Sequence, residues 1–152
     1  MDKKTAISDF VSQRTYALVG ISRGGKKFGN MIHKELTTRG YQVIPVHPQA
    51  ESIEGVRCYP SLSALPEPVG GVIVVVPPAQ AEKVVQEAHA AGIQRVWLQQ
   101  GAESPAAIRF CEENNLTVVH GECIMMFAEP RGIHRFHRWL WGLLGKLPKP
   151  GS

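Results

Sequence analysis

The sequence lacks several features that would set it apart from ordinary globular proteins. Its only cysteines, Cys58, Cys111 and Cys123, are odd in number and have no Cys-x-x-Cys spacing, which excludes a disulfide framework and agrees with a reducing compartment. No apolar run approaches the roughly 20 residues that a membrane-spanning helix needs. The charged start, MDKKTAISDF, has no apolar segment behind it, so we expect no secretory signal peptide and a cytoplasmic protein.

The sequence does contain enough apolar residues for one core, and its charge is unevenly distributed. Apolar residues make up 43% of the 152 residues, which suits a single domain. Residues 1–39 hold eight Lys and Arg against three Asp and Glu, and residues 131–152 hold five against none. Such basic segments suit a nucleic acid, an anionic membrane surface or a small anionic ligand, and charge alone leaves the three open.

Strands and helices are predicted to alternate from residue 16 to residue 119. The fully apolar stretch at 72–76 indicates a strand buried on both faces, as in a parallel sheet. Because the connections are short, each strand–helix–strand unit predicts a right-handed crossover. The pattern therefore predicts an α/β fold, a Rossmann-like doubly wound parallel sheet of about five strands. The expected strands are 16–19, 42–46, 72–76, 95–98 and 116–119, and the expected helices begin near 28, 79 and 104.

Two amphipathic stretches are interpreted as helices. Four apolar residues recur at helical spacing after the first glycine-rich loop, namely Phe28, Met31, Ile32 and Leu36. A second stripe predicts a C-terminal helix over residues 131–147, and it consists of Ile133, Phe136, Leu140 and Leu143. We expect this helix to pack on residues 1–130, with 131–152 as the basic helix and tail of the same domain, or to pair with a second copy in a homo-oligomer.

The loop over residues 20–29 is the strongest candidate for a binding site. It holds four glycines, the hydroxyl of Ser22 and the cations Arg23, Lys26 and Lys27. Small residues let backbone N–H groups approach a phosphate, and the start of a helix favours negative charge. The dinucleotide pattern Gly-x-Gly-x-x-Gly is absent because Ser22 stands at its second glycine, and no Lys-Ser/Thr pair completes a Walker A motif. The loop predicts a phosphate site of another kind.

The end of the second strand bears on which nucleotide binds. It reads Val46-His47-Pro48, and no acid follows until Glu51. An NAD site usually places Asp or Glu there to accept hydrogen bonds from the ribose hydroxyls. Coenzyme A (CoA) carries a phosphate on that ribose, which an acid would repel. A neutral or basic strand end therefore favours CoA over NAD, while NADP stays open.

Four patches together give a resemblance to a known family. Gly20-x-Ser22, the stretch RGYQVIPVHP, the stretch VVVPP and Trp97-Leu98-Gln99-Gln100-Gly101 occur in this order. Over roughly residues 10–130 they resemble the small CoA-binding proteins, whose fold is similar to the N-terminal domain of the succinyl-CoA ligase alpha subunit. The resemblance implies CoA or an acyl-CoA as the ligand. It implies no ligase activity, because the ligase's catalytic phosphohistidine belongs to a second domain.

The resemblance also implies which residues of this chain bind the cofactor, and these fall at the ends of four strands. The phosphates would meet the first loop at Gly20, Ser22, Arg23 and Lys26. The adenosine end would be lined by Val46, His47 and Pro48. The opposite wall would consist of Val76, Pro77 and Pro78, and the residues near the end of the fourth strand would be Gln100 and Gly101.

Other interpretations remain beside this one. His120 and Cys123 could form a thiol–imidazole pair, and His134 and His137 could join Cys123 at a metal site. A buried cysteine and solvated histidines are the simpler interpretation, so we expect neither catalysis nor a metal. The aromatic and basic tail could meet a membrane or a nucleic acid, although packing against protein is preferred. The preferred interpretation is a non-catalytic protein with a small nucleotide ligand. The alternative is an NAD(P)-binding redox sensor or reductase.

Overall fold

The computed structural model describes residues 2–25 and 27–129. Strands β1 (Thr15–Val19), β2 (Gln42–Val46), β5 (Gly71–Val74), β6 (Arg95–Gln99) and β7 (Thr117–Glu122) alternate with helices α2 (Phe28–Thr38), α3 (Pro78–Ala90) and α4 (Pro105–Glu113). Helix α1 (Lys3–Val11) comes first, and β2 is followed by a hairpin of β3 (Ser52–Ile53) and β4 (Val56–Arg57). Two 3-10 turns are η1 (Leu62–Ala64) and η2 (Ile124–Met126). The helix predicted over 131–147 lies outside the described residues.

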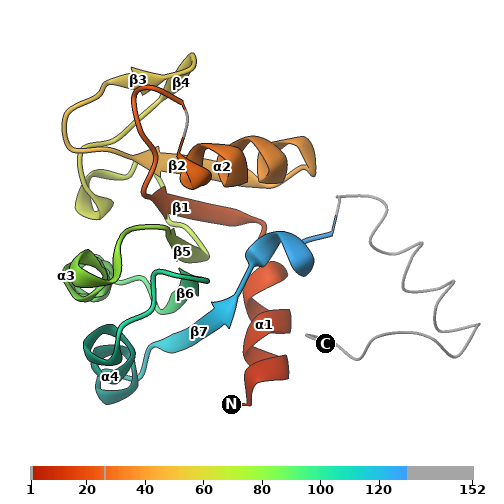
Figure 1. The fold of residues 1–152 in the computed structure, drawn as a ribbon, viewed down its shortest axis with the longest axis vertical. Coiled ribbons are helices and arrows are strands. Elements are labelled where there is room, and N and C mark those ends of the chain that lie inside the picture. Colours follow the sequence, from red (N-terminus) through yellow and green to blue (C-terminus); the bar gives the residue numbers. More distant parts are fainter. Residues whose placement is uncertain (1, 26, 130–152) are drawn as a thin grey trace, which may run out of the picture.

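The five long strands form one parallel sheet in the order β2-β1-β5-β6-β7 (Figure 1). Ala17 of β1 pairs with Ile44 of β2 on one side and with Val72 of β5 on the other. The strand that follows β1 in the sequence, β2, lies on one side of it, and the later strands β5, β6 and β7 lie on the other side. The doubly wound α/β fold predicted from the sequence is confirmed. Its strand order reverses between β1 and β5, and open α/β sheets bind ligands beyond the carboxyl ends of the strands at such a point.

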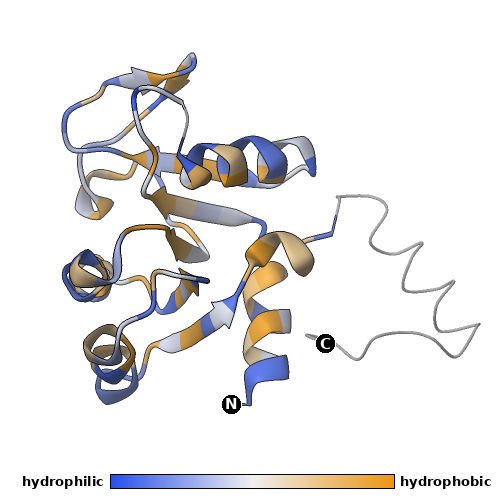
Figure 2. Cartoon of the chain, viewed as in Figure 1, coloured by the Kyte–Doolittle hydropathy of each residue, from blue (hydrophilic) through white to orange (hydrophobic). Residues whose placement is uncertain are grey.

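Helices cover both faces of the sheet, which is why the strands are apolar throughout. On one face α1, α2 and η2 pack around Phe10, Ile32 and Trp97. On the other face α3 and α4 pack around Val84 and Leu98. Figure 2 shows the apolar stretches of α1 and η2 lying close together beside the end of β7. Among the described residues no helix is long and apolar enough to cross a membrane.

Helix α1 and the small hairpin were not predicted. Asp2 caps α1 by accepting a hydrogen bond from the backbone N–H of Thr5 at 2.8 Å. The buried side chains of Ala6, Ile7 and Phe10 then recur at helical spacing, a pattern that could have identified the helix. Strand limits shift slightly as well, since the strand expected at 72–76 ends at Val74.

The predicted apolar stripe of α2 is wrong in part. Ile32 and Leu36 are buried, but Phe28 and Met31 are 42% and 55% exposed. The inward face of the first turn is instead formed by Gly29 and Asn30. Small and polar residues lie inside here because this turn meets the loop after β1 rather than the apolar core. The first turn of α2 thus belongs to the candidate site and not to the hydrophobic core.

Candidate functional site

A cavity of about 510 Å³ lies beyond the carboxyl ends of β1, β2 and β5, where the strand order reverses. The sheet register brings these ends together, because Val19 pairs with Val46 of β2 and with Val74 of β5. One face of α3 forms a further wall, and its Gln80, Lys83 and Glu87 follow at helical spacing. The cavity therefore combines three strand ends, two connecting loops and one helix.

Half of the predicted cofactor-binding residues line this cavity. They are Gly20, Val46, His47, Pro48, Val76 and Pro77. Pro78 follows directly as the first residue of α3, and Ser22 and Arg23 continue the loop that begins at Gly20. Lys26 lies outside the described residues.

Gln100 and Gly101 do not line the cavity. They follow β6, which is separated from β1 by β5, and both are exposed. The backbone N–H of Gly101 donates a hydrogen bond to Oε2 of Glu103 at 3.0 Å. The backbone N–H of Gly101 is therefore already paired with an acid of its own loop, at the end of β6 next to β5.

Two glycines let the backbone of the loop, of β5 and of α2 meet at one point. Gly20 has a φ of +127°, and a Cβ atom there would collide with the carbonyl oxygen of Val75. A Cβ atom on Gly29 would collide with the carbonyl oxygen of Gly20. Since both obstacles are backbone atoms, they cannot swing aside as a side chain could. These glycines allow α2 to begin directly beside the end of β1.

The backbone of Ser22 is held by a side chain that the sequence analysis did not identify. Asn30 of α2 accepts a hydrogen bond from the N–H of Ser22 at 2.9 Å and donates one to its carbonyl oxygen at 3.0 Å. The N–H of Ser22 is therefore not available to a ligand in this arrangement, and the Ser22 hydroxyl donates a longer hydrogen bond to the same Oδ1 atom at 3.4 Å. No periodic pattern pairs positions 22 and 30, so this contact emerges only from the tertiary structure.

His47 is present as a neutral hydrogen-bond donor rather than as a cation. Its Nδ1 accepts hydrogen bonds from the backbone N–H groups of Gln49 at 3.1 Å and Ala50 at 3.0 Å. The remaining proton of the neutral ring must then lie on Nε2. Desolvation first, and then the charges of Arg23 and Lys27, lower the pKa of His47 below its ordinary value. The end of β2 therefore offers a neutral donor to the cavity.

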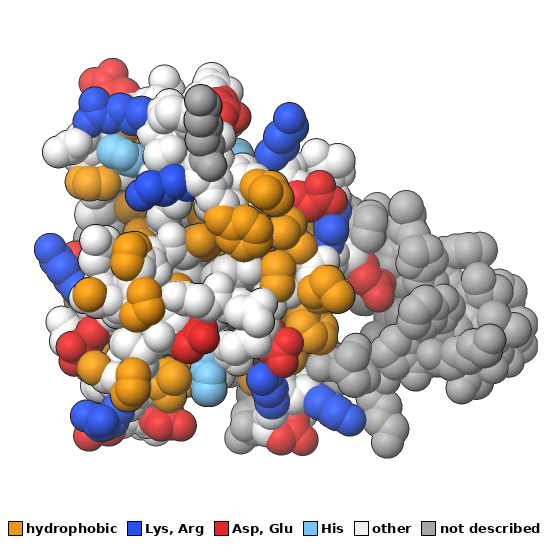
Figure 3. Space-filling model, viewed as in Figure 1, with side chains coloured by type: hydrophobic (Ala, Val, Ile, Leu, Met, Phe, Trp, Pro, Cys, Tyr) orange, Lys and Arg blue, Asp and Glu red, His pale blue; other side chains and the backbone are white. Residues whose placement is uncertain are grey.

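Positive charge comes instead from the loop after β1 and from α3. Arg23 donates a hydrogen bond to Oε1 of Gln49 at 2.7 Å, which joins the loops after β1 and β2. Gln49 is neutral, so this contact orients the guanidinium without cancelling its charge. Lys27 and Lys83 line the cavity, together with one acid, Glu87. Figure 3 shows Lys and Arg side chains on this side of the molecule, around the hairpin and the start of α2.

The starts of α2 and α3 add partial positive charge. Neither helix has an acidic residue in its first turn, and neither is capped by a side chain of the described residues. Unpaired N–H groups at a helix start attract anions. Lys83 was not predicted as a site residue, but its spacing from Ala79 on the predicted helix could have placed both on one face. Together these groups suit a ligand with several phosphates.

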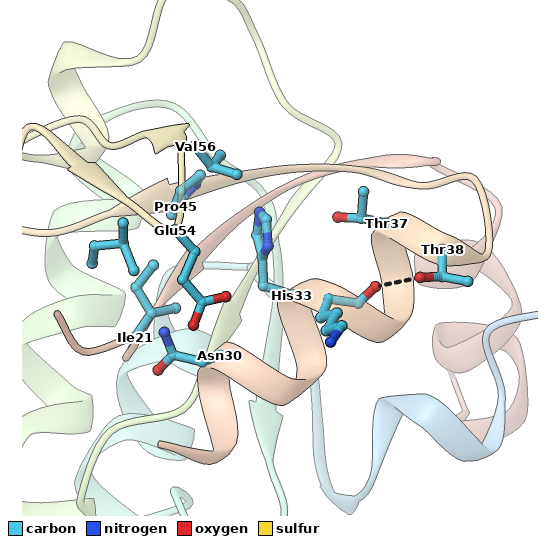
Figure 4. A pocket seen from close by; sticks show the side chains of 10 residues that line it. Ile21, Asn30, His33, Thr37, Thr38, Pro45, Glu54 and Val56 are labelled. Atoms are coloured by element: carbon cyan, nitrogen blue, oxygen red, sulfur yellow. Dashed lines mark hydrogen bonds between the residues drawn. The ribbon is translucent and has the colours of Figure 1, made fainter. Parts of the chain in front are cut away.

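A smaller cavity of about 240 Å³ lies behind the loop, between α2 and the β3–β4 hairpin (Figure 4). Asn30 and His33 of α2 face Glu54 and Val56 of the hairpin across it. A Cβ atom on Gly25 would collide with the carboxylate of Glu54, so the tip of the hairpin touches the loop. The loop is thus supported from behind by α2 and by the hairpin.

The cysteines and histidines show no assembled catalytic or metal centre in the part of the chain that the structure describes. Burial raises the pKa of the Cys58 thiol, and it raises that of Cys111 to about 12, so both stay protonated and unreactive. Cys123 is half-buried and His120 is exposed. Among the described residues no three His, Cys, Asp or Glu side chains are grouped to hold a metal ion. His134 and His137 lie outside these residues.

One protein family matches nearly all of the described chain. The family model described as "CoA binding domain" matches residues 14–129. The uncharacterized protein YneT of Bacillus subtilis (strain 168) is 30% identical over 108 residues, which are 71% of this chain and 80% of YneT. The ADP-forming acetate–CoA ligase I of Archaeoglobus fulgidus is 38% identical over 74 residues, which are 49% of this chain and 11% of the ligase.

A solved structure shares the fold. A conserved hypothetical protein from Pyrococcus furiosus is 42% identical and superposes with a TM-score of 0.71. The superposition covers 74% of this chain and 97% of that protein. The small parallel sheet with helices on both faces is therefore common to the two proteins.

Gly29→Ala should destabilise the fold by about 1–3 kcal/mol, because the added methyl group has no room against the carbonyl oxygen of Gly20. The gain in helix propensity, about 1 kcal/mol, works in the opposite direction and is the smaller effect. Urea unfolding followed by circular dichroism measures the change. Gly24→Ala is the matched control, since nothing lies within 4 Å of its Cβ position. Equal stability of the two variants would contradict the close approach of α2 to β1.

The imidazole of His47 should titrate below its ordinary value of 6.5. Because folding favours the neutral ring, its contribution to stability is complete above this value and is lost as the pH falls toward the lowered pKa. Nitrogen NMR of the ring measures both the titration and the proton position, and His47→Gln assigns the signal. A titration at or above the ordinary value would contradict the effect of desolvation and of the nearby cations on this ring. A proton on Nδ1 of the neutral ring would show that the hydrogen bonds from Gln49 and Ala50 are not formed.

Proposed function

This chain belongs to the CoA-binding domain family, and from that membership we propose that it binds CoA or an acyl-CoA through the loop over residues 20–29, without catalysing a reaction of its own. One observation carries the proposal. The cavity at the strand-order reversal is lined by Lys27 and Lys83, and Arg23 follows in the same loop as Gly20, while the adjoining end of β2 presents the neutral donor His47 instead of an acid. A ligand with phosphates on both sides of an adenosine matches this arrangement.

The residues present fit each part of such a ligand. The pyrophosphate would lie against the hydroxyl of Ser22 and the start of α2, with the charge of Arg23 beside it. The adenosine would lie between two walls, one formed by Val46, His47 and Pro48, the other by Val76, Pro77 and Pro78. CoA would supply its thiol as the point where an acyl group is carried. Gln100 and Gly101 are proposed to meet the ligand only where it extends past β5 toward the end of β6.

The alternatives have less support. A reductase or redox sensor with NAD would need an acceptor for the ribose hydroxyls at the end of β2, and the first acid there, Glu51, is an exposed residue beyond the turn at His47. The thiol–imidazole alternative needs Cys123 beside His120, and among the described residues no hydrogen bond joins these two side chains. The thiols of Cys58 and Cys111 are buried and their pKa values are raised. Binding to a nucleic acid or a membrane, and pairing with a second copy, all depend on residues 131–147. A cytoplasmic location also remains a proposal.

Calorimetric titration with CoA, 3′-dephospho-CoA and NAD tests the choice of ligand. CoA should bind most tightly, because its 3′-phosphate can reach a cation and meets no carboxylate at the end of β2. Removal of that phosphate should cost about 1.5–3 kcal/mol of binding free energy, the usual value of a charge-assisted hydrogen bond. Tight binding of NAD with no CoA signal would refute the proposal and favour the redox alternative.

Arg23→Gln together with Lys26→Gln tests the phosphate loop. The double substitution should weaken CoA binding by about 1–3 kcal/mol for each lost contact, and it should reduce the dependence of affinity on salt. The melting temperature should hardly change, because exposed charges contribute little to stability. Lys4→Gln on α1, far from the cavity, is the control for the loss of one positive charge. If the double variant binds as tightly as the wild type, the phosphates lie elsewhere.

A further inference from the structure

Asn30 is a buried polar side chain that hydrogen-bonds to one residue of the phosphate loop. It lies in the first turn of α2 and is 7% exposed. Its Oδ1 accepts from the N–H of Ser22 at 2.9 Å, and its Nδ2 donates to the carbonyl oxygen of Ser22 at 3.0 Å. In Figure 4 the amide lies at the inner end of the smaller cavity, beside Ile21. The contact is therefore on the rear of the loop, away from the side that would face a ligand.

The amide of Asn30 pairs with both backbone groups of Ser22, as a neighbouring strand would. Its orientation follows from these partners, because a flipped amide would set donor against donor and acceptor against acceptor. The first turn of α2 reaches the loop because Gly29 has no side chain against Gly20. A loop rich in glycine is otherwise costly to order. The two hydrogen bonds fix the backbone of the loop just before Arg23, Gly24 and Gly25.

We infer that Asn30 is a positioning residue for the phosphate site, a role that rests on the proposed function. It fixes the backbone of Ser22 through two hydrogen bonds, while the Ser22 hydroxyl makes only a longer one to Oδ1 of Asn30 at 3.4 Å and can exchange it for a phosphate. Asn30 itself does not touch the ligand. It lowers the conformational entropy that the loop would otherwise lose on binding. A residue needed here only for packing would be apolar, because a buried amide is costly unless its hydrogen-bond partners are in place.

Substitutions in the full chain separate positioning from folding. Asn30→Ala removes the two hydrogen bonds to the backbone of Ser22 and the longer one from its hydroxyl. Asn30→Asp keeps the shape and the acceptor, but when ionised it lacks the donor and adds negative charge near the phosphates. When protonated, the introduced carboxyl can again donate to the carbonyl oxygen of Ser22. Ile32→Val, on the same helix, is the control, because it trims a fully buried core side chain without contact to Ser22.

The groups around position 30 determine where the introduced carboxyl titrates. Glu54 of the hairpin and His33 and Lys34 of α2 line the same cavity, and the carboxylate of Glu54 extends toward Asn30 in Figure 4. Burial and the nearby Glu54 should raise the pKa of the introduced carboxyl above its ordinary value, and the charge of Lys34 acts in the opposite direction, so affinity is measured as the pH is lowered from about 8 to about 5. Each affinity is divided by that of the wild type at the same pH. This ratio cancels the effect on affinity of the titration of His47 and of the CoA phosphates, which both proteins share.

CoA affinity measured by calorimetry should then separate the variants. Asn30→Ala should bind CoA about tenfold or more weakly than the wild type, and Ile32→Val less than about threefold more weakly, even where their melting temperatures fall alike. Asn30→Asp should bind more than about tenfold more weakly near pH 8 and recover to within about threefold of the wild type near pH 5. A role in folding alone would not make the relative affinity of a folded variant recover at low pH.

Two results would overturn the inference while leaving the proposed function intact. One is wild-type affinity in Asn30→Ala, and the other is a loss in Asn30→Asp that is the same at every pH. If Asn30→Ala does not fold, Asn30→Ser takes its place, because it is neutral and cannot pair with both backbone groups of Ser22, whereas the negative charge in Asn30→Asp would repel a phosphate even without a positioning role. A wild-type chain that binds no CoA would overturn the proposed function and this inference together, so the two failures are distinguishable.

Discussion

The meeting of three backbone segments at Gly20 is the constraint on which the candidate site depends. Any side chain at this position would collide with the carbonyl oxygen of Val75, and any side chain on Gly29 would collide with the carbonyl oxygen of Gly20. Because both glycines leave this space empty, β1, β5 and the start of α2 converge beyond one edge of the sheet. The cavity, the positive end of α2 and the loop with its cations all lie around this point.

Within the candidate site, cationic side chains supply charge and neutral side chains hold the loops by hydrogen bonds. Arg23, Lys27 and Lys83 supply the positive charge. The nearby His47 stays neutral because desolvation, and then the charges of Arg23 and Lys27, lower its pKa. Neutral side chains hold the loops, since Gln49 accepts from Arg23 and Asn30 pairs with Ser22. An acid at position 49 would have formed an ion pair with Arg23, and an acid at position 30 would have placed negative charge behind the loop. The amides orient the loops and leave the field of the cations intact.

The sheet that carries the candidate site at the carboxyl ends of its strands is stabilised elsewhere by ordinary apolar packing. Phe10 stacks on Tyr16 with ring centroids 4.8 Å apart, and Trp97 tilts against Phe10 at 5.3 Å. Arg39 donates to the carbonyl oxygens of Met125 and Ala128, which holds the segment after β7 against α2. These contacts lie on the face covered by α1 and α2, outside the larger cavity. The apolar packing and the candidate site therefore consist mostly of different residues, which lets the loop be rich in glycine and charge.

The sequence by itself determined the fold class, the strands of the sheet and the loop after β1, because apolar runs, helical spacing and glycines are local signals. It also placed His47 and Pro77 beside this loop, since parallel strands end at one edge. Only the tertiary structure decided that Asn30 pairs with Ser22, that Lys83 lines the cavity and that Gly101 stays one strand end away. The physical reason is that these relations depend on contacts between distant segments, on the rotation of α2 and α3 about their axes and on the order of the strands, none of which leaves a periodic pattern in the sequence.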